Sequence, residues 1–205
     1  NMFIGFFGRE GGKRKIKYRI ERADKCPRNI LQLRYGIWKG LPVKSPIGLS
    51  IEEFAILLGY FLSEGSIDKS GYSNKIVISQ SKDNRMGEDL TRMGFYKNGN
   101  RYLITNKDWV NYFEQFGLSN KKYIPSWFMD AEPHILRLFL NAFLLGDGSV
   151  RERVHRFKNI NSTEKTYFTT STVLAEQIGE LITKVGKYPS FYLSERKGKE
   201  VTHKN

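Results

Sequence analysis

The sequence predicts an α+β protein built from two similar halves. Three observations lead to this prediction: an apolar helical pattern ending in an acid and a glycine occurs twice, strand-like stretches follow each copy, and a further helix ending in glycine follows those strands. Internal repetition with only two copies indicates a pseudo-dimer rather than a solenoid. At 205 residues the chain can bury one good-sized core or two small fused ones.

The first 49 residues are basic and rich in glycine. Within residues 13–22, basic side chains alternate with apolar ones, which predicts a strand with one basic face. Pro42 and Pro46 then interrupt the chain. The expected organisation is a basic N-terminal extension at 1–49, a first half at 50–132 and a second half at 133–205.

The first repeated helix is expected to begin at about residue 51. Ser50 and Glu53 have the spacing of a capping box, and apolar residues follow at helical intervals. The pattern continues to Glu64, and Gly65 is expected to end the helix as a left-handed stop.

The second repeated helix begins at Pro133, a residue that favours the first helical turn, and continues in the same rhythm to Asp147 and Gly148. The flanking elements recur as well, namely strand-like stretches at 75–81 and 165–171 and helix ends at Gly94 and Gly186. Each half therefore reads as helix, two strands, helix, two strands, with a further helix near residues 107–116 in the first half.

Small residues recur four positions apart in both helices. Gly59 and Ser63 share one helical face, and so do Ala142 and Gly146. Faces with so little side-chain bulk allow two helix backbones to approach closely.

Close parallel packing of these helices would bring Glu64 and Asp147 together at one end. Two neighbouring carboxylates repel each other unless a proton or a cation lies between them. Hard oxygen ligands favour Mg²⁺, which keeps several waters and completes its shell with substrate phosphate. The pair is therefore a candidate metal site for phosphodiester hydrolysis.

The nine-residue segments Leu57–Gly65 and Leu140–Gly148 resemble the LAGLIDADG motif of homing endonucleases. Their separation resembles that of the single-chain, two-motif members, and the resemblance covers roughly residues 50–200. The two copies agree in length, in the positions of small residues, in the terminal acid and in the glycine after it.

This resemblance implies two αββαββα halves whose antiparallel sheets form a DNA-binding saddle around the paired helices. It also implies site-specific double-strand cleavage across the minor groove of a long asymmetric target, leaving short 3′ overhangs. Glu64 replaces the usual Asp, and Leu62 and Leu145 stand where polar residues are common. Since both acids are retained, an active nuclease is favoured.

The resemblance further implies metal binding by Glu64 and Asp147, with the Gly65 and Gly148 region and the backbone carbonyls of Ser63 and Gly146 as further ligands. Mg²⁺ is the expected cofactor, and Mn²⁺ is the expected substitute. The remaining catalytic candidates are Lys122, with Lys121 as the fallback, and Gln80, with Thr172 as its nearest counterpart in the second half.

Lys122 is singled out because the stretch Lys122–Pro125 resembles the Lys-x-Ile-Pro block of intein-borne members. It is expected to stabilise phosphate charge or to order the attacking water.

Double-stranded DNA is the expected partner. Contacts to bases and phosphates are expected from strands at about 66–82, 95–105, 149–171 and 187–197. In the third of these, basic Arg151 and Arg153 alternate with Val150 and Val154, which predicts one charged face. The candidates are Lys69, Asn74, Lys75, Arg101, Arg151, Arg153, Arg156, Lys158, Tyr192, Arg196 and Lys197.

The composition agrees with a polyanionic partner. Lysine and arginine total 34 against 21 acidic residues, giving a net charge of +13. Basic residues are spread along the chain among Tyr and Phe, and no apolar run could cross a bilayer, so a membrane partner is not expected. Cys26 is the only cysteine, which excludes a disulfide within the chain and a thiolate zinc cluster. We expect an intracellular monomer with internal pseudo-two-fold symmetry, located in the cytoplasm or nucleoid, or in an organelle if the source is eukaryotic.

Alternatives on the same fold stay open at this point. One is an intron RNA maturase, and another is a catalytically silent DNA-binding module. The chain could also be the nuclease part of an intein, in which case residues 1–49 are an intein remnant rather than a DNA-recognition arm.

Overall fold

The computed structural model describes residues 2–10, 13–21, 38–70, 72–80, 84–155 and 160–192. The chain forms two units, Asn1–Trp38 and Lys39–Asn205. In the first unit, strands β1 (Met2–Glu10) and β2 (Lys13–Glu21) pair as an antiparallel hairpin in which Glu10 lies opposite Lys13. The strand expected within residues 13–22 is therefore present.

The boundary between the units lies earlier than residue 49 because the segment after Lys39 is anchored in the second unit. The Leu41 N–H donates to the carbonyl oxygen of Asp130 at 2.7 Å. The indole N–H of Trp109 donates to the carbonyl oxygen of Ile47 at 2.9 Å.

The described residues of the first half of the second unit form five helical segments and four strands. Helix α1 (Ile51–Glu64) begins at the predicted capping box, in which the Ser50 side chain accepts from the Glu53 N–H. The elements that follow are β3 (Gly65–Asp68), β4 (Lys75–Ser79), α2 (Asn84–Arg92), β5 (Tyr96–Asn98), β6 (Arg101–Ile104), α3 (Lys107–Glu114), η2 (Ser119–Lys121) and α4 (Ser126–Met129). The strands form an antiparallel sheet in the order β3-β4-β6-β5.

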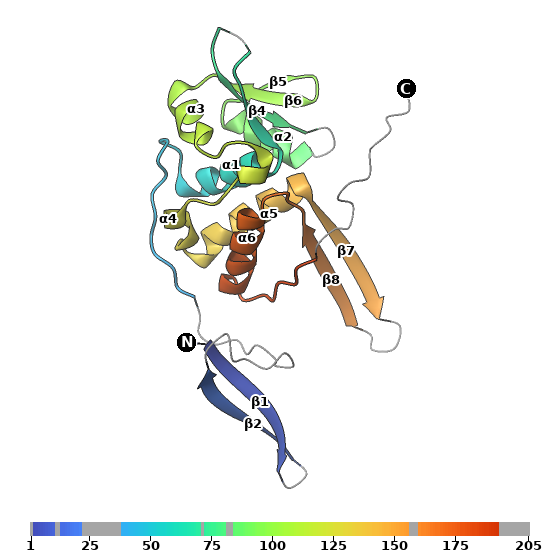
Figure 1. Cartoon of the computed structure of the whole chain (residues 1–205). Coiled ribbons are helices and arrows are strands. Elements are labelled where there is room, and N and C mark those ends of the chain that lie inside the picture. The colour runs from blue at the N-terminus through green and yellow to red at the C-terminus, as the bar shows by residue number, and fades with distance from the viewer. Residues whose placement is uncertain are drawn as a thin grey trace. The chain divides into compact units, whose positions relative to one another are not determined.

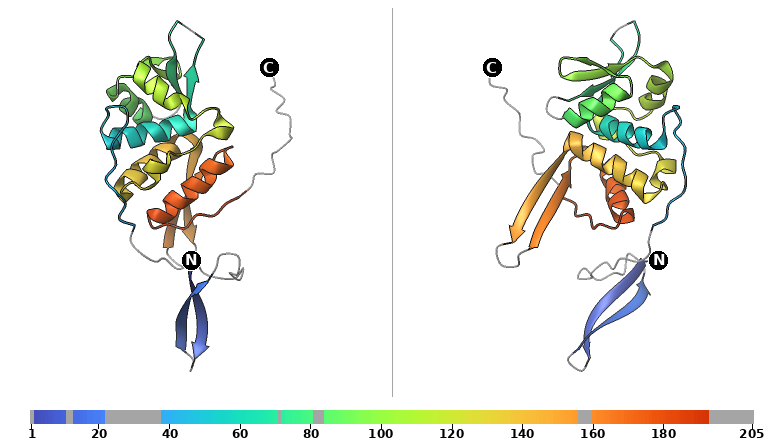
Figure 2. Two further views of the ribbon diagram at one scale, coloured as in Figure 1. Left: turned by 60° about the vertical axis from the view of Figure 1, so that its left-hand side comes forward. Right: turned by 180° about the vertical axis from the view of Figure 1, so that it is seen from behind.

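The second half begins with α5 (Pro133–Asp147), which has Pro133 in its first turn as predicted. Strands β7 (Gly148–His155) and β8 (Ile160–Tyr167) form an antiparallel hairpin, and α6 (Thr172–Lys184) follows. Helices α1, α5 and α6 lie in successive layers (Figure 1, and Figure 2 from two further sides).

The strand expected at about 187–197 is not found in its described part, residues 187–192. This segment packs back onto α6 instead: a Cβ added to Gly179 would lie 2.3 Å from a ring carbon of Phe191. Pro189 also lacks the N–H that strand pairing requires. The described second half is therefore αββα rather than αββαββα.

The core lies between the layers of helices and against one face of the first sheet. The predicted apolar positions of α1 and α5 are buried, and rings of the two halves meet where Phe128 and Phe139 approach to 5.5 Å between centroids. Phe54 and Phe61 of α1 contact Phe113 of α3. In the described part of the chain, no helix has the length and apolar character needed to cross a membrane.

The glycines after the paired helices serve a different purpose from the predicted one. Gly65 has φ −89° and Gly148 has φ −140°, so both are extended and neither is a left-handed stop. Each is needed for space, since an added Cβ would lie within 2.6 Å of atoms of the preceding turn, on Phe61 and on Leu144. Because glycine has no side chain, strands β3 and β7 can begin directly after helices α1 and α5.

Candidate active site

Helices α1 and α5 are parallel and unusually close. A Cβ on Gly59 would lie 2.7 Å from the Ala142 Cβ, and one on Gly146 would lie 2.7 Å from the Ser63 Cβ. Any side chain at these glycines would overlap the other helix. The small-residue face predicted from the sequence is therefore the contact between the helices.

This packing brings Glu64 and Asp147 to the same end of the helix pair. The position of a Cβ on Gly146 lies only 3.0 Å from Cγ of Glu64. Burial raises the pKa of the Glu64 carboxyl, and the neighbouring charge of Asp147 raises it further. Burial likewise raises the pKa of Asp147. The two acids therefore form a half-buried site with unbalanced negative charge.

Lys122 lies beneath this pair and is only 5% exposed. Its ammonium group donates to the carbonyl oxygens of Phe61 and Gly65, both at 2.8 Å, and lies 5.3 Å from the centroid of the Phe61 ring. Burial lowers the pKa of Lys122 to about 8, while the charges of Asp147 and Glu64 oppose this shift. Lys122 therefore stabilises the last turn of α1 through hydrogen bonds, and its positive charge interacts with the charges of Glu64 and Asp147.

The donor set fits a hard divalent cation. Glu64 and Asp147 supply carboxylate oxygens, and the charge of Asp147 adds to burial in raising the pKa of Glu64, so the two ionised acids repel each other unless a cation lies between them. Among the described residues there is no cluster of three or more His, Cys, Asp or Glu side chains. Two carboxylates with otherwise open coordination are typical of Mg²⁺ sites that include water and phosphate.

The other expected catalytic candidates lie in different settings. Gln80 follows β4, and its N–H donates to the carbonyl oxygen of Asn100 at 2.9 Å. Thr172 is the exposed first residue of α6, and Lys121 is exposed at the end of η2. Of the two lysines, only Lys122 is shown beside the acids.

The outer face of the sheet in the first half is mixed, with the apolar pair Val77 and Leu103 among polar and charged side chains. Because side chains alternate along a strand, Ile76 and Ile78 point to the core while Lys75 and Ser79 point to the other side. Arg101 lies opposite Ser79 in the register and is exposed. The charges of two predicted DNA-binding residues, Lys75 and Arg101, contribute to lowering the pKa of Asp68, after the hydrogen bonds from Ser70.

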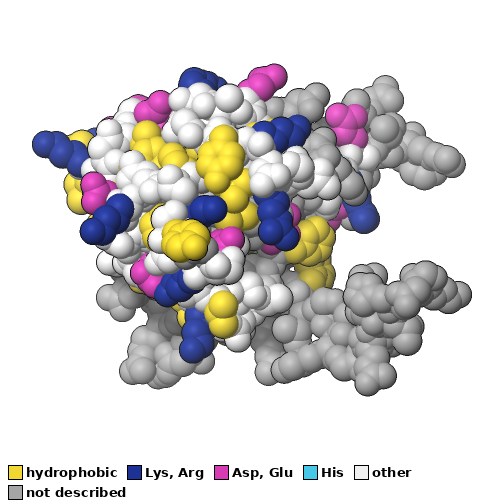
Figure 3. Space-filling view, turned by 90° about the horizontal axis from the view of Figure 1, so that it is seen from above, with side chains coloured by type: hydrophobic (Ala, Val, Ile, Leu, Met, Phe, Trp, Pro, Cys, Tyr) yellow, Lys and Arg dark blue, Asp and Glu magenta, His cyan; other side chains and the backbone are white. Residues whose placement is uncertain are grey.

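In the second half, Arg151 projects from the face of the hairpin that points away from α5. On the other face, the Lys165 ammonium donates to the Asn141 side chain at 3.3 Å and the Tyr167 ring contacts Phe143. Arg151 lies opposite Glu164, one position out of phase with Lys165. On the one face seen in Figure 3, Lys and Arg side chains are distributed around exposed hydrophobic ones rather than gathered into one block.

The remaining DNA-binding candidates divide into three groups. Lys69 forms an exposed ion pair with Glu114 of α3, and Asn74 is exposed. Tyr192 is 90% exposed and follows α6 outside any strand. The side chain of Arg153, and the residues Arg156, Lys158, Arg196 and Lys197, lie outside the described part of the structure.

Sequence reasoning missed two side chains that support the site. Ser171 donates to the carbonyl oxygen of Lys122, and Gln177 forms two hydrogen bonds to the backbone of Ile124. These partners lie about 50 positions apart in the sequence. The only local signal was that Ser171 precedes an apolar helical pattern, which is typical of a helix cap.

Comparisons with known proteins give the following matches. The structure, α+β with antiparallel sheets, is similar to the homing endonuclease I-DmoI solved in complex with DNA and Mn, with a TM-score of 0.45 and 15% identity over 71% of this chain and 84% of that one. It is also similar to mesophilic variants of I-DmoI, with a TM-score of 0.34 and 13% identity over 66% of this chain and 96% of those chains.

In sequence, the chain is 25% identical over 155 residues to the A subunit of DNA gyrase from Mycobacterium kansasii. The match covers 68% of this chain and spans about a quarter (27%) of the length of that gyrase polypeptide. No protein-family profile matches the sequence.

Proposed function

We propose that this chain is a site-specific, double-strand DNA endonuclease of the LAGLIDADG homing type that depends on Mg²⁺, with Mn²⁺ as a substitute. The observation that carries the proposal is the close parallel packing of α1 and α5, which places Glu64 and Asp147 in one half-buried, negatively charged site. Its target is a long asymmetric DNA sequence, because the two halves differ in their strand residues.

Glu64 and Asp147 would hold the divalent metal, with the backbone around Ser63 and Gly146 as a further source of oxygen ligands. When bound, such an ion supplies activation of a water molecule and stabilisation of the leaving oxygen of the phosphodiester. Lys122 keeps the last turn of α1 in place through its bonds to Phe61 and Gly65. Its positive charge also limits the repulsion between the acids.

DNA would lie across the outer faces of the two sheets. Lys75 and Arg101 in the first half and Arg151 in the second project from these faces. A net charge of +13 favours attraction of the phosphate backbone, and exposed arginines can also read guanine. We propose a monomer with internal pseudo-two-fold symmetry as the active form.

The nuclease could be carried within a host protein as part of an intein. Two observations favour this context: the block Lys122–Pro125 and the match to part of a DNA gyrase polypeptide. Expression of the chain in its natural sequence context, followed by mass spectrometry of the products, tests it, because protein splicing would join the flanking segments. Unspliced products alone would contradict an intein.

Cleavage of a randomised double-stranded DNA library tests the proposed function. The purified chain is incubated with the library in Mg²⁺ or in EDTA, and the new DNA ends are sequenced. We expect Mg²⁺-dependent ends that share one long motif and carry short 3′ overhangs. Binding without cleavage would contradict the nuclease and favour a silent DNA-binding module. If the chain neither binds nor cleaves DNA, structured intron RNA is the next substrate to test, as for a maturase.

A further inference from the structure

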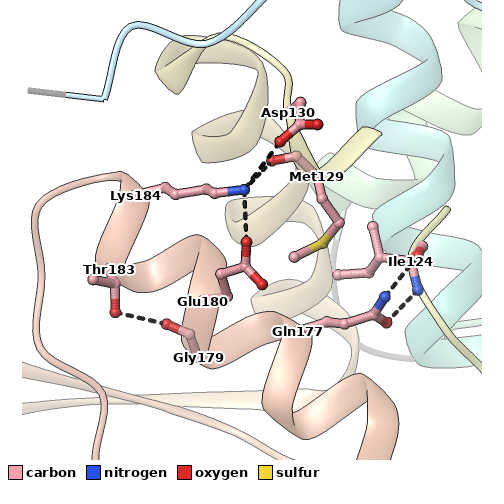
Figure 4. A network of polar contacts seen from close by, with 8 residues as sticks. All are labelled: Ile124, Met129, Asp130, Gln177, Gly179, Glu180, Thr183 and Lys184. Atoms are coloured by element: carbon pink, nitrogen blue, oxygen red, sulfur yellow. Dashed lines mark hydrogen bonds and ion pairs between the residues drawn. The ribbon is translucent and has the colours of Figure 1, made fainter. Parts of the chain in front are cut away.

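Two side chains of α6, the N-cap Ser171 and Gln177, form hydrogen bonds to the backbone of the segment that carries Lys122. Ser171 is 2% exposed, and its hydroxyl donates to the carbonyl oxygen of Lys122 at 2.7 Å while accepting from the Leu174 N–H at 3.2 Å. The side-chain amide of Gln177 accepts from the Ile124 N–H at 2.7 Å and donates to the Ile124 carbonyl oxygen at 2.8 Å (Figure 4).

These contacts matter because residues 122–125 lie between η2 and α4 and form neither helix nor strand. Lys122 and Ile124 are buried, so their backbone groups need partners that regular secondary structure does not supply. The side-chain amide of Gln177 bonds both the N–H and the carbonyl oxygen of Ile124, as the backbone of a neighbouring strand would do. The position of the Lys122 backbone is thereby tied to α6.

The Lys122 ammonium has little freedom to compensate if its backbone moves. It must reach the carbonyl oxygens of Phe61 and Gly65 together, and both bonds are 2.8 Å long. A shift of the segment would lengthen these bonds and change the distance between the ammonium and the two carboxylates. Geometry at such sites is sensitive to displacements of about 1 Å.

We propose that Ser171 and Gln177 are positioning residues that fix Lys122 beside Glu64 and Asp147. A helix of the second half thus sets the arrangement at the end of α1, in the first half. This inference rests on the proposed function, because it assigns a role in DNA cleavage to contacts of the same site.

The same helix provides a matched control. Lys184, near the C-terminal end of α6, donates to the carbonyl oxygen of Met129 at 2.8 Å and pairs with Asp130 at 3.4 Å and with Glu180 at 2.7 Å (Figure 4). It therefore joins α6 to the same connecting region as Gln177 does. These three partners lie outside residues 122–125, so loss of the Lys184 ammonium should affect stability with little effect on the position of Lys122.

The test compares Gln177→Met and Ser171→Ala with the control Lys184→Met and the conservative variant Ser171→Thr. For each, the single-turnover cleavage rate, the DNA dissociation constant and the thermal unfolding midpoint are measured. Supporting residues around a metal site typically change activity by about 10–100-fold. We expect at least about a 10-fold slower rate for Gln177→Met and Ser171→Ala, with DNA affinity nearly unchanged.

Ser171→Thr should cleave at close to the wild-type rate, because a threonine hydroxyl can make both bonds. Lys184→Met should lower the unfolding midpoint but leave the rate within about a factor of two, as for an independent site. Equal loss of rate in Lys184→Met would overturn the inference, since the effect would then reflect general loosening of α6.

A double-mutant cycle gives a sharper result. If Gln177 acts through Lys122, Gln177→Met should cause no further loss of rate in a Lys122→Met background. Multiplicative losses would show that Gln177 acts by another route and would contradict the proposal.

A readout independent of cleavage separates this inference from the proposed function. The Lys122 side chain lies near the Phe61 ring, so its ¹³Cε–¹H resonance should be displaced from those of exposed lysines. Selective lysine labelling, with Lys122→Met for assignment, makes this resonance observable. Gln177→Met and Ser171→Ala should move it toward the exposed-lysine position, and Lys184→Met should not. A wild-type chain that never cuts DNA would defeat the proposed function, whereas an unmoved resonance would defeat the positioning role.

Discussion

At the scale of single residues, the candidate site brings charged side chains together in a partly buried place, at a cost to the stability of the fold. Glu64 and Asp147 are half-buried and close, and the nearby Lys122 has its pKa lowered to about 8. Each of the three charged forms is disfavoured by burial. Functional sites commonly carry such a cost to stability.

This cost can be measured by replacing an acid with its amide. Because the carboxyl pKa values are raised on folding, the folded state binds more protons than the unfolded state. Stability therefore falls as pH rises from about 4 through the raised pKa values. Without metal at pH 7.5, Glu64→Gln and Asp147→Asn should raise the unfolding midpoint, by roughly 2–4 °C for each 1 kcal/mol of relieved cost.

The gain should shrink as the pH is lowered to 4, because the wild-type carboxyls with raised pKa values lose their charge as they take up protons. Glu88→Gln, which changes an exposed carboxyl on α2, serves as the control and should show little change at either pH. A lower midpoint for both site variants at pH 7.5 would contradict the electrostatic account.

At the scale of elements, the paired helices follow from local signals. The capping box at Ser50, the proline at the start of α5 and the spacing of apolar residues predicted both helices, and the structure confirms them. The small residues at Gly59 and Gly146 also predicted close packing correctly. The prediction of a left-handed stop at Gly65 was wrong. A glycine that is needed because no Cβ fits and a glycine that adopts positive φ cannot be told apart in a sequence.

The contact between the helices predicts the effect of an added methyl group. In Gly146→Ala the new Cβ would lie 2.7 Å from the Ser63 Cβ. Overpacking costs about 1–3 kcal/mol and is partly offset by about 1 kcal/mol from better helix propensity. We expect a net loss of up to about 2 kcal/mol in the free energy of unfolding, measured by urea denaturation.

The clash can be relieved from the other helix. Adding Ser63→Gly to Gly146→Ala returns the missing space, so the double variant should lose less stability than the two single changes combined. Simple additivity would mean that the two residues do not share a contact.

At the scale of the whole molecule, the excess of positive charge predicts salt-sensitive DNA binding. The logarithm of the binding constant should fall linearly with the logarithm of salt concentration. If Lys75 and Arg101 contact phosphates, alanine at either should reduce the slope by about 1. Lys107→Ala, which changes an exposed lysine at the start of α3, is the control and should leave the slope unchanged. An equal change of the salt slope in Lys107→Ala would show that DNA binding depends on the overall positive charge and not on contacts from the sheet face.

The limits of prediction from sequence also appear at this scale. Glu64, Asp147 and Lys122 could be selected because a repeated motif and a short block mark them. The roles of Ser171 and Gln177 could not, since their partners are Lys122 and Ile124 and only folding brings them together. The strand expected at about 187–197 failed in its described part because Phe191 packs against Gly179 of α6.

The most direct test of the central claim uses a duplex recovered from the library. Wild type, Glu64→Gln and Asp147→Asn are compared on it in Mg²⁺, with DNA binding measured separately in EDTA. If both acids hold the metal, each variant should lose double-strand cleavage by at least about 100-fold, or nearly 3 kcal/mol of barrier, while still binding the duplex. Cleavage of both strands at close to the wild-type rate by either variant would contradict the assignment of the site.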